Sequence, residues 1–182
     1  MKHPFLIGES IYLRGLEEQD LAGNYFQWFN DQDVCQYNSH GRYPNNLDKM
    51  MAYLKKTHSD PSLVVFAIIL KENNEHVGNI SLQGINFIDR NAEYAIILGE
   101  QKCWGKGVAK AASDMIIKYG FLTLNLHRIH CGTSAKNLGM QKLASYLGMK
   151  EEGRRRDALY KHGEYVDLIE YGILRHEYLT RS

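Results

Sequence analysis

Apolar positions divide the chain into two kinds of segment. In some segments apolar residues recur every three or four positions, which places them on one face of a helix; in others they form short continuous or alternating runs typical of strands. Strands are therefore expected at 11–14, 64–70, 76–82, 92–98, 128–133 and along a terminal hairpin that turns at 162–164 and ends with 166–174. Helices are expected at 20–29, from 46 or 47 to 58, from 108 onward and at 137–147. This order predicts an α/β protein with a mixed, mostly antiparallel sheet of about seven strands and helices on both faces.

Composition and charge are typical of one globular domain spanning residues 1–182. Of these residues, 44% are hydrophobic and 24% are charged, and the length suffices for one sizeable core. The net charge of +1 does not indicate a nucleic-acid partner or an anionic membrane, and the basic run at 154–156 is interpreted as a solvated turn. The sequence contains neither an apolar stretch as long as a membrane span nor a signal-peptide core, so a cytoplasmic protein is expected.

The cysteines and histidines do not form a metal-binding pattern. Cys35, Cys103 and Cys131 are odd in number and include no Cys-x-x-Cys pair, so we expect free thiols. His127 and His130 lie at the start of a predicted strand, where alternation sends their side chains to different environments. No metal site is expected.

The segment 101–109, with sequence Gln-Lys-Cys-Trp-Gly-Lys-Gly-Val-Ala, joins a predicted buried strand to a predicted helix. At such a junction unpaired backbone N–H groups point the same way, with the positive end of the helix dipole behind them. Gly105 and Gly107 allow a phosphate to approach these amides, and Lys102 and Lys106 add positive charge. The segment is therefore a candidate pyrophosphate site. A plain helix N-terminus after a tight turn is the alternative; the glycine spacing fits neither a Rossmann motif nor a P-loop.

This segment resembles the acetyl-CoA loop of the GNAT superfamily of N-acetyltransferases, in which Gln or Arg is followed at fixed spacing by two small residues. Lys102 takes the Gln or Arg position, and Gly105 and Gly107 take the other two. The strand at 91–98 and the helical segment at 137–149 also resemble their counterparts in the superfamily. Within it the chain is most similar to the branch of ribosomal-protein, spermidine and aminosugar N-acetyltransferases.

The resemblance covers the chain from about Glu9 to Tyr178 and implies the GNAT fold, with acetyl-CoA as co-substrate. It also implies direct attack of a primary amine on the thioester. In the superfamily the oxyanion is stabilised by backbone N–H groups at the end of the strand that corresponds to Ile97 and Leu98. The cofactor-binding residues implied in this way are Ile97, Leu98, Lys102, Trp104, Gly105, Lys106, Gly107, Val108, Ala109 and Asn137.

Glu93 is the candidate general base. A primary amine has a pKa near 10, so at neutral pH it is mostly protonated and must lose a proton before it attacks. An acid between Ala92 and Tyr94 is unusual for a merely buried strand, and acids at this strand position act as the base in many superfamily members. The alternatives are that Glu93 faces solvent or forms a salt bridge with Arg90.

No side chain is assigned to protonate the departing thiolate. Counted from Asn137, which is also a good helix N-cap residue, the tyrosine of many relatives is replaced by Ala144, and the serine of the ribosomal-protein branch is replaced by Met140. The neighbouring Ser145 and Tyr146 point in other directions on a helix. Water, or a tyrosine from elsewhere in the chain, is left for this role.

The acceptor pocket is expected in the segment 25–43, where aromatic and polar residues are interleaved. The candidate substrate-binding residues are Trp28, Tyr37, His40 and Tyr43. Aromatic faces beside polar groups suit a sugar ring, so an aminosugar is the expected acceptor. The alternative is that Trp28 and Tyr37 only anchor the helix at 20–29.

Other acceptors and one non-enzymatic role stay open. Polyamine acetylation would require a denser acidic cluster than Asp31, Asp33 and Asp48 provide, and acetylation of a ribosomal-protein N-terminus would require an open groove. A non-catalytic acetyl-CoA-binding module is the alternative from another class, motivated by Ala144 and Met140. The partners considered are a small-molecule amine and a second copy of the chain in a homodimer.

Overall fold

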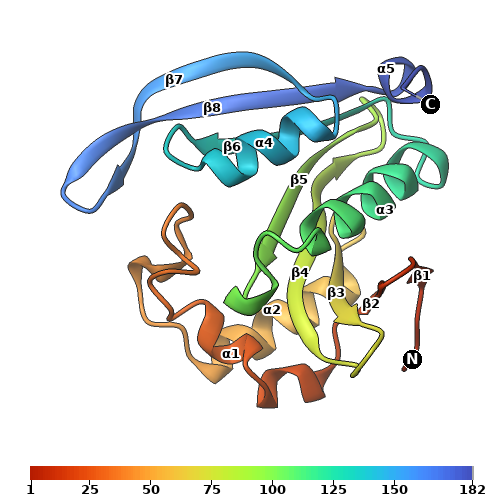
Figure 1. Ribbon diagram of the computed structural model, residues 1–182, viewed down its shortest axis with the longest axis vertical. Coiled ribbons are helices and arrows are strands. Elements are labelled where there is room, and N and C mark those ends of the chain that lie inside the picture. Colours follow the sequence, from red (N-terminus) through yellow and green to blue (C-terminus); the bar gives the residue numbers. More distant parts are fainter. Residues whose placement is uncertain (182) are drawn as a thin grey trace.

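The computed structural model describes residues 1–181 and contains one sheet of eight strands, in the order β1-β2-β3-β4-β5-β6-β8-β7 (Figure 1). The strands are β1 (Leu6–Ile7), β2 (Ile11–Gly15), β3 (Val64–Leu70), β4 (His76–Asn86), β5 (Asn91–Leu98), β6 (Arg128–Ser134), β7 (Lys150–Lys161) and β8 (Glu164–Leu174). All neighbouring strands are antiparallel except β5 and β6, which are parallel. The predicted mixed sheet is therefore confirmed. The additional strand, β1, has two residues and is too short to leave a periodic pattern.

Helices cover both faces of the sheet, as expected. The α-helices are α1 (Tyr25–Trp28), α2 (Leu47–Ser59), α3 (Val108–Leu122), α4 (Leu138–Tyr146) and α5 (Arg175–Leu179), and the 3₁₀ helices are η1 (Glu18–Ala22), η2 (His40–Arg42) and η3 (Gln101–Cys103). One buried cluster joins α3 and α4 to the sheet, and a second joins α1 and α2 to its other face through side chains such as Trp28, Met50 and Ile69. Within residues 1–181 no helix is long and apolar enough to cross a membrane.

The prediction of a single helix at 20–29 is wrong, because the structure divides this segment into η1 and α1. Gly23 ends η1 in an extended conformation, with φ −97° and ψ −164°, and its N–H donates to Asp20 O. The Asp20 carboxylate accepts hydrogen bonds from the Glu17 N–H and from the Arg14 guanidinium. This local network fixes the end of η1, and the chain turns before α1 begins.

The terminal hairpin turns where the sequence predicts. His162 and Gly163 have positive φ angles of 50° and 84°, the combination that a two-residue hairpin turn requires. Lys161 Nζ, at the end of β7, donates to the carbonyl oxygen of Cys35 at 3.0 Å. The tip of the hairpin is thus connected to the loop that precedes α2.

Strands β5 and β6 separate soon after they begin, and this separation positions the functional site. They pair over only three positions, the last of which joins Glu93 to His130. Beyond it β5 pairs with β4 as far as Leu98, and β6 pairs with β8 as far as Ser134. Figure 1 shows the two strands diverging. The β5 edge that faces β6 is therefore without a partner strand over residues 94–98 in the described chain.

Candidate active site

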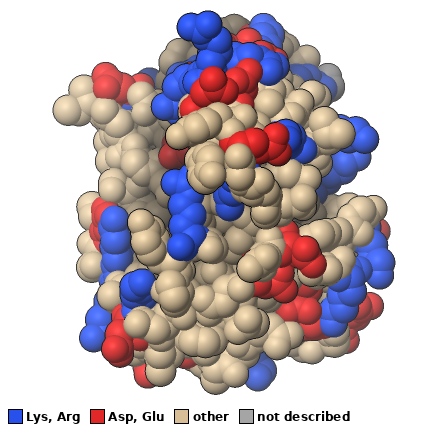
Figure 2. All heavy atoms as spheres, turned by 90° about the vertical axis from the view of Figure 1, so that its left-hand side faces the viewer, with Lys and Arg blue, Asp and Glu red and all other residues tan. Residues whose placement is uncertain are grey.

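A cleft of about 1120 Å³ opens where β5 and β6 diverge. Its walls come from β4, β5, the turn that contains Gly105 and Gly107 (the glycine turn), α4, α2 and the loop between α1 and α2. Figure 2 shows the side of the molecule that carries this loop and the β7–β8 hairpin; a broad uncharged area lies in its lower middle, with charged side chains to either side. The cleft brings together residues that lie far apart in the sequence, from Tyr25 to Leu143.

The glycine turn has the geometry expected of an anion cradle. Gly105 and Gly107 adopt left-handed conformations with φ of 72° and 82°, which residues with a Cβ rarely adopt. Gly107 is the N-cap of the fifteen-residue α3, and no side chain caps this end. Both glycines and Ala109 line the cleft, and nothing lies within 4 Å of the place where either glycine's Cβ would be. The first amides of α3 are thus open to an anion that enters the cleft.

Among the other predicted cofactor-binding residues near this turn, Trp104 lines the cleft, whereas Lys102, Lys106 and Val108 do not. Trp104 lines the cleft, and its indole N–H donates to Leu98 O at 2.8 Å, which ties the glycine turn to the end of β5. Lys102 does not line the cleft; its ammonium is paired with the Glu75 carboxylate at 2.6 Å. Lys106 is also outside the lining, and Val108 is buried in the core under α3. Backbone groups therefore dominate this wall.

Glu93 extends into the cleft from the point where β5 and β6 stop pairing. Its side chain is exposed. The alternative of a salt bridge to Arg90 is not found in the described residues, because the Arg90 guanidinium donates to Asn125 O at 2.9 Å and to Asn125 Oδ1 at 3.3 Å. Glu93 is thus accessible to a substrate or a water molecule in the cleft.

A row of polar side chains on β4 lies beside Glu93, and the sequence reasoning missed it. Asn79, Ser81 and Gln83 alternate with apolar residues, so all three face the cleft, and in the β4–β5 register Gln83 lies opposite Glu93. Gln83 Nε2 donates to Ser81 Oγ at 2.9 Å. The sequence does indicate this row, because every second residue of an otherwise apolar strand is polar from 79 to 83. Such a row suits a site that binds amine and hydroxyl groups.

The end of β5 and the start of α4 face each other across the cleft. Ile97 and Leu98 line it with the partnerless edge of β5. Asn137 lines the opposite side and caps α4, since its Oδ1 accepts the N–H of Met140 at 3.0 Å. The Asn137 side-chain N–H₂ group remains available to a bound molecule.

Helix α4 has no hydroxyl group at 140 or 144, the two positions considered for the acid that protonates the departing thiolate. Ala144 is fully buried in the core, and Met140 lines the cleft with an apolar chain. Tyr146 does not line the cleft; its hydroxyl donates to Asp114 Oδ2 at 2.7 Å. Tyr94 reaches the cleft lining, but its hydroxyl bonds to Ser113 Oγ at 2.6 Å and burial raises its pKa.

Three of the four predicted acceptor residues line the cleft, namely Tyr37, His40 and Tyr43. Trp28 does not. It is 3% exposed and packs at ring-centroid distances of 5.4 Å from Tyr25 and 5.0 Å from His76. Its indole N–H donates to Glu100 Oε1 at 3.0 Å. The structure thus makes Trp28 a core residue beneath the cleft, the alternative that the sequence left open.

Further cleft residues escaped the sequence reasoning because they come from elements outside 25–43. Tyr53 of α2, Asn45 and Lys49 also line the cleft. Tyr53 falls on the α2 face that also carries Met50, so helical periodicity could have indicated it.

Cys35, Cys103 and Cys131 are all buried free thiols, as expected. Cys103 lines the cleft, and burial raises its pKa, which disfavours the thiolate. Residues 1–181 contain no group of three or more His, Cys, Asp or Glu side chains placed to hold a metal ion.

Comparison with known proteins identifies the family. Residues 10–150 match the family model described as the acetyltransferase (GNAT) domain. The chain therefore belongs to the GNAT acetyltransferase family, and it is an N-acetyltransferase.

Individual relatives agree with this assignment and with the expected branch. The chain is 31% identical to the Bacillus licheniformis protein named uncharacterized N-acetyltransferase p20, over 95% of this chain and 97% of the relative. It is 28% identical to the spermidine N(1)-acetyltransferase of Escherichia coli K12, over 94% of this chain and 89% of the relative. Its fold matches the crystal structure of spermidine N-acetyltransferase from Vibrio cholerae in complex with CoA and spermine, with a TM-score of 0.84, 27% identity, and coverage of 93% and 98% of the two chains.

Proposed function

We propose that the chain transfers the acetyl group of acetyl-CoA directly to a primary amine bound in this cleft. The observation that carries the proposal is that one cleft contains the glycine turn, the partnerless β5 edge and the Glu93 carboxylate. An anion site, a peptide-like edge and a base are the three features that acyl transfer from a thioester to an amine requires. A non-catalytic acetyl-CoA-binding module would have no need of the third.

In this proposal the backbone holds most of the co-substrate. The pyrophosphate lies against the N–H groups that follow Gly105 and Gly107 at the start of α3. The pantetheine arm, which contains two amides, pairs with the free edge of β5 over residues 94–98 and contacts the side chain of Asn137. The V-shaped opening between β5 and β6 admits this arm.

The reaction takes place at the thioester, which lies at the end of the pantetheine arm. Glu93, directly or through a water molecule, accepts a proton from the substrate ammonium, and the free amine attacks the thioester carbonyl. Backbone N–H groups near Ile97 and Leu98 stabilise the oxyanion. The C–N bond forms in this attack, and the C–S bond breaks when the oxyanion collapses back to a carbonyl. The attacking nitrogen, positively charged after the attack, loses one of its two protons and keeps the other in the product amide. The coenzyme A thiol has a pKa near that of cysteine, about 8.5, so water suffices to protonate the thiolate.

A polyamine of the spermidine type is the acceptor we propose. Relatives named as spermidine acetyltransferases match the chain over 94% of its length and match its fold over 93%. Glu93 would serve the reacting amine, and Asp33, which lines the cleft from the α1–α2 loop, would pair with a distal ammonium.

An aminosugar is the second candidate, because a specific observation favours it. Only two carboxylates, those of Asp33 and Glu93, are among the described residues that line the cleft, together with three lysines, Lys49, Lys110 and Lys142. Tyr37, Tyr43 and Tyr53 also line it, and we call the part of the cleft that they line the acceptor end. Aromatic faces with a polar floor and few carboxylates suit a ring with hydroxyl groups better than a multiply charged chain.

Competition between acceptors tests the proposal. Thiol release from acetyl-CoA is measured with spermidine, with an amino-hexose or its nucleotide conjugate, and with a short peptide that has a free N-terminus. We expect kcat/KM for spermidine to exceed the other values by at least about tenfold. A tenfold preference for the amino-hexose would reverse the order of the two candidates. Acetyl-CoA binding without thiol release from any amine would instead establish the non-catalytic module.

Tyr37→Ala tests which end of the cleft binds the acceptor. Tyr37 is 36% exposed and lines the acceptor end, so its removal takes away stacking area there. We expect the acceptor KM to rise about three- to tenfold while the acetyl-CoA KM stays unchanged. Tyr165→Ala is the control, since Tyr165 packs against Tyr160 at the hairpin tip in a tilted arrangement and does not line the cleft. An equal rise of both KM values in the Tyr37 variant would contradict this placement.

A further inference from the structure

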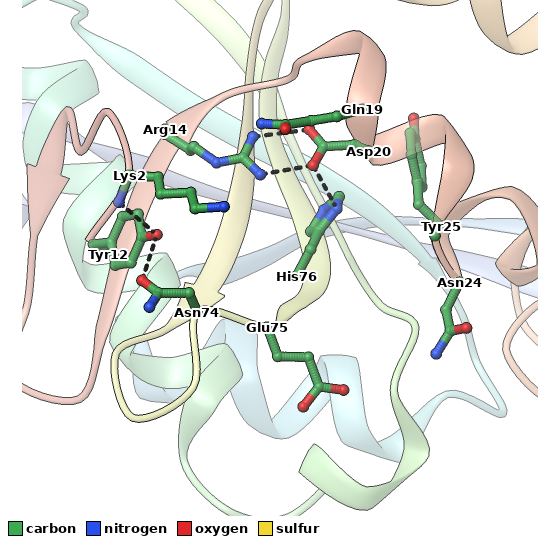
Figure 3. Close-up of a pocket in the computed structure, with 11 residues that line it drawn as sticks. Lys2, Tyr12, Arg14, Gln19, Asp20, Asn24, Tyr25, Asn74, Glu75 and His76 are labelled. Atoms are coloured by element: carbon green, nitrogen blue, oxygen red, sulfur yellow. Dashed lines mark hydrogen bonds and ion pairs between the residues drawn. The ribbon is translucent and has the colours of Figure 1, made fainter.

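A half-buried histidine, His76, connects the polar floor of the cleft to an ion pair behind it. Figure 3 shows His76 next to the Asp20 carboxylate, which is in turn bound by the Arg14 guanidinium. These residues line a second cavity of about 410 Å³, and Tyr25 lines both this cavity and the cleft. The His76 side chain is 13% exposed.

The two nitrogens of His76 have different partners. Nδ1 lies 3.5 Å from Asp20 Oδ1. Nε2 lies 3.0 Å from Gly78 O and 2.8 Å from Asn79 Oδ1. A backbone carbonyl only accepts hydrogen bonds, so Nε2 carries a proton and donates it. The atom of the Asn79 amide that faces Nε2 must then be the oxygen.

This contact fixes the direction of the Asn79 amide. With its oxygen held by His76, the N–H₂ group of Asn79 points away from His76; it donates to the Tyr25 hydroxyl, and Asn79 lines the cleft. Asn79 is only 6% exposed and lies opposite Ile97 in the β4–β5 register. Without the histidine the amide could rotate and present its oxygen instead.

The surroundings hold His76 rigidly. Its ring packs against Tyr25 at 5.4 Å and against Trp28 at 5.0 Å between centroids. Burial by itself opposes ionisation of Asp20, but the hydrogen bonds from the Arg14 guanidinium outweigh it and hold the pKa of this carboxyl well below its usual range. A fixed carboxylate on one side and a fixed carbonyl on the other leave the imidazole one orientation.

We propose that His76 is a positioning residue for acetyl transfer. By binding Asn79 Oδ1 it directs the Asn79 N–H₂ group into the acceptor end of the cleft, as a donor to the water between acceptor and base. This inference rests on the proposed function, since it assigns the acceptor to that end of the cleft. It also gives Trp28 an indirect part in acceptor binding, through its packing on His76.

His76→Phe tests the proposal, because phenylalanine keeps the ring packing and removes the hydrogen bond. We expect the acceptor KM to rise about three- to tenfold, the size expected for one neutral hydrogen bond, with the acetyl-CoA KM unchanged. His76→Gln, whose amide nitrogen can replace Nε2 as the donor, should restore most of the wild-type KM. His58→Phe is the matched control, since His58 Nε2 also lies 3.0 Å from a backbone carbonyl, that of Leu16, and His58 does not line the cleft.

A double-variant test separates positioning from general stability. In an Asn79→Ala background the amide is absent, so His76→Phe should no longer change the acceptor KM. An undiminished effect in that background, an unchanged KM in the single variant, or an equal rise of both KM values would overturn the proposal.

A measurement without turnover keeps the inference distinct from the proposed function. In nuclear magnetic resonance spectra, the side-chain amide protons of Asn79 should exchange faster with solvent in His76→Phe than in the wild type, and His76→Gln and His58→Phe should resemble the wild type. Equal exchange rates in His76→Phe and wild type would contradict the positioning role. Failure of the wild type to acetylate any amine would contradict only the proposed function.

Discussion

Gly107→Val is expected to abolish most of the thermal stabilisation that acetyl-CoA gives the protein. At a ligand concentration of about one hundred times Kd, the wild type should gain about 2.7 kcal/mol, which corresponds to a rise in Tm of roughly 5–10 °C for a chain of this size. A valine at φ 82° is strained, and its side chain would occupy the space that a phosphate needs in front of the first amides of α3. Differential scanning calorimetry with and without acetyl-CoA measures both effects.

Gly163→Val separates loss of binding from strain. Gly163 has nearly the same φ, 84°, and like Gly107 has nothing within 4 Å of its would-be Cβ, but it lies at the hairpin turn and does not line the cleft. Both variants should lose stability without ligand, and only Gly107→Val should lose the shift caused by acetyl-CoA. A full shift in Gly107→Val would refute the assignment of the glycine turn to the co-substrate.

Glu93→Gln should lower kcat roughly ten- to a thousandfold and leave acetyl-CoA affinity unchanged. Glutamine keeps the size and polarity of the side chain, and it cannot accept the proton of the ammonium. The measurement is steady-state thiol release with a saturating acceptor, together with the acetyl-CoA-dependent rise in Tm. Glu72→Gln is the control, because Glu72 is an exposed carboxylate in the β3–β4 turn and does not line the cleft.

The loss of activity in Glu93→Gln should become smaller as the pH rises. Below the amine pKa, near 10, the fraction of free amine rises about tenfold for each pH unit. A variant without a base depends on that free fraction, so its rate should keep rising toward pH 10, and the difference from wild type should shrink. A Glu93→Gln enzyme that is as fast as wild type at pH 7, or whose deficit is constant from pH 7 to 10, would assign the base to another group.

The parts of the fold that follow local rules could be predicted from the sequence. Strands such as 64–70 are short apolar runs bounded by turn residues, and the observed β3 covers the same positions. The glycine turn was predictable because left-handed backbone at Gly105 and Gly107 is a local property. Glu93 was indicated by an acid in an apolar strand, and its contact with the cleft follows from the fold.

What could not be predicted depends on particular side-chain contacts, some of them between distant segments. The break between η1 and α1 depends on Arg14 binding Asp20 as well as on Gly23. Trp28 pairs with Glu100, 72 positions away, so an aromatic pattern in 25–43 could not show whether its ring faces the cleft or the core. Lys102 is paired with Glu75 for the same kind of reason, and a positive charge near a glycine turn was therefore insufficient to place it in the site.

The partnerless edge of β5 has a consequence for how this enzyme could diversify. Every residue carries the main-chain N–H and C=O groups that such an edge offers, so side chains along 94–98 could drift during evolution with little change in the way a thioester arm is held. The loop at 30–45, by contrast, contributes side chains to the cleft, and substitutions there would alter acceptor preference directly. We therefore expect gene duplicates of this enzyme to keep the donor substrate and to exchange acceptors through changes in that one loop.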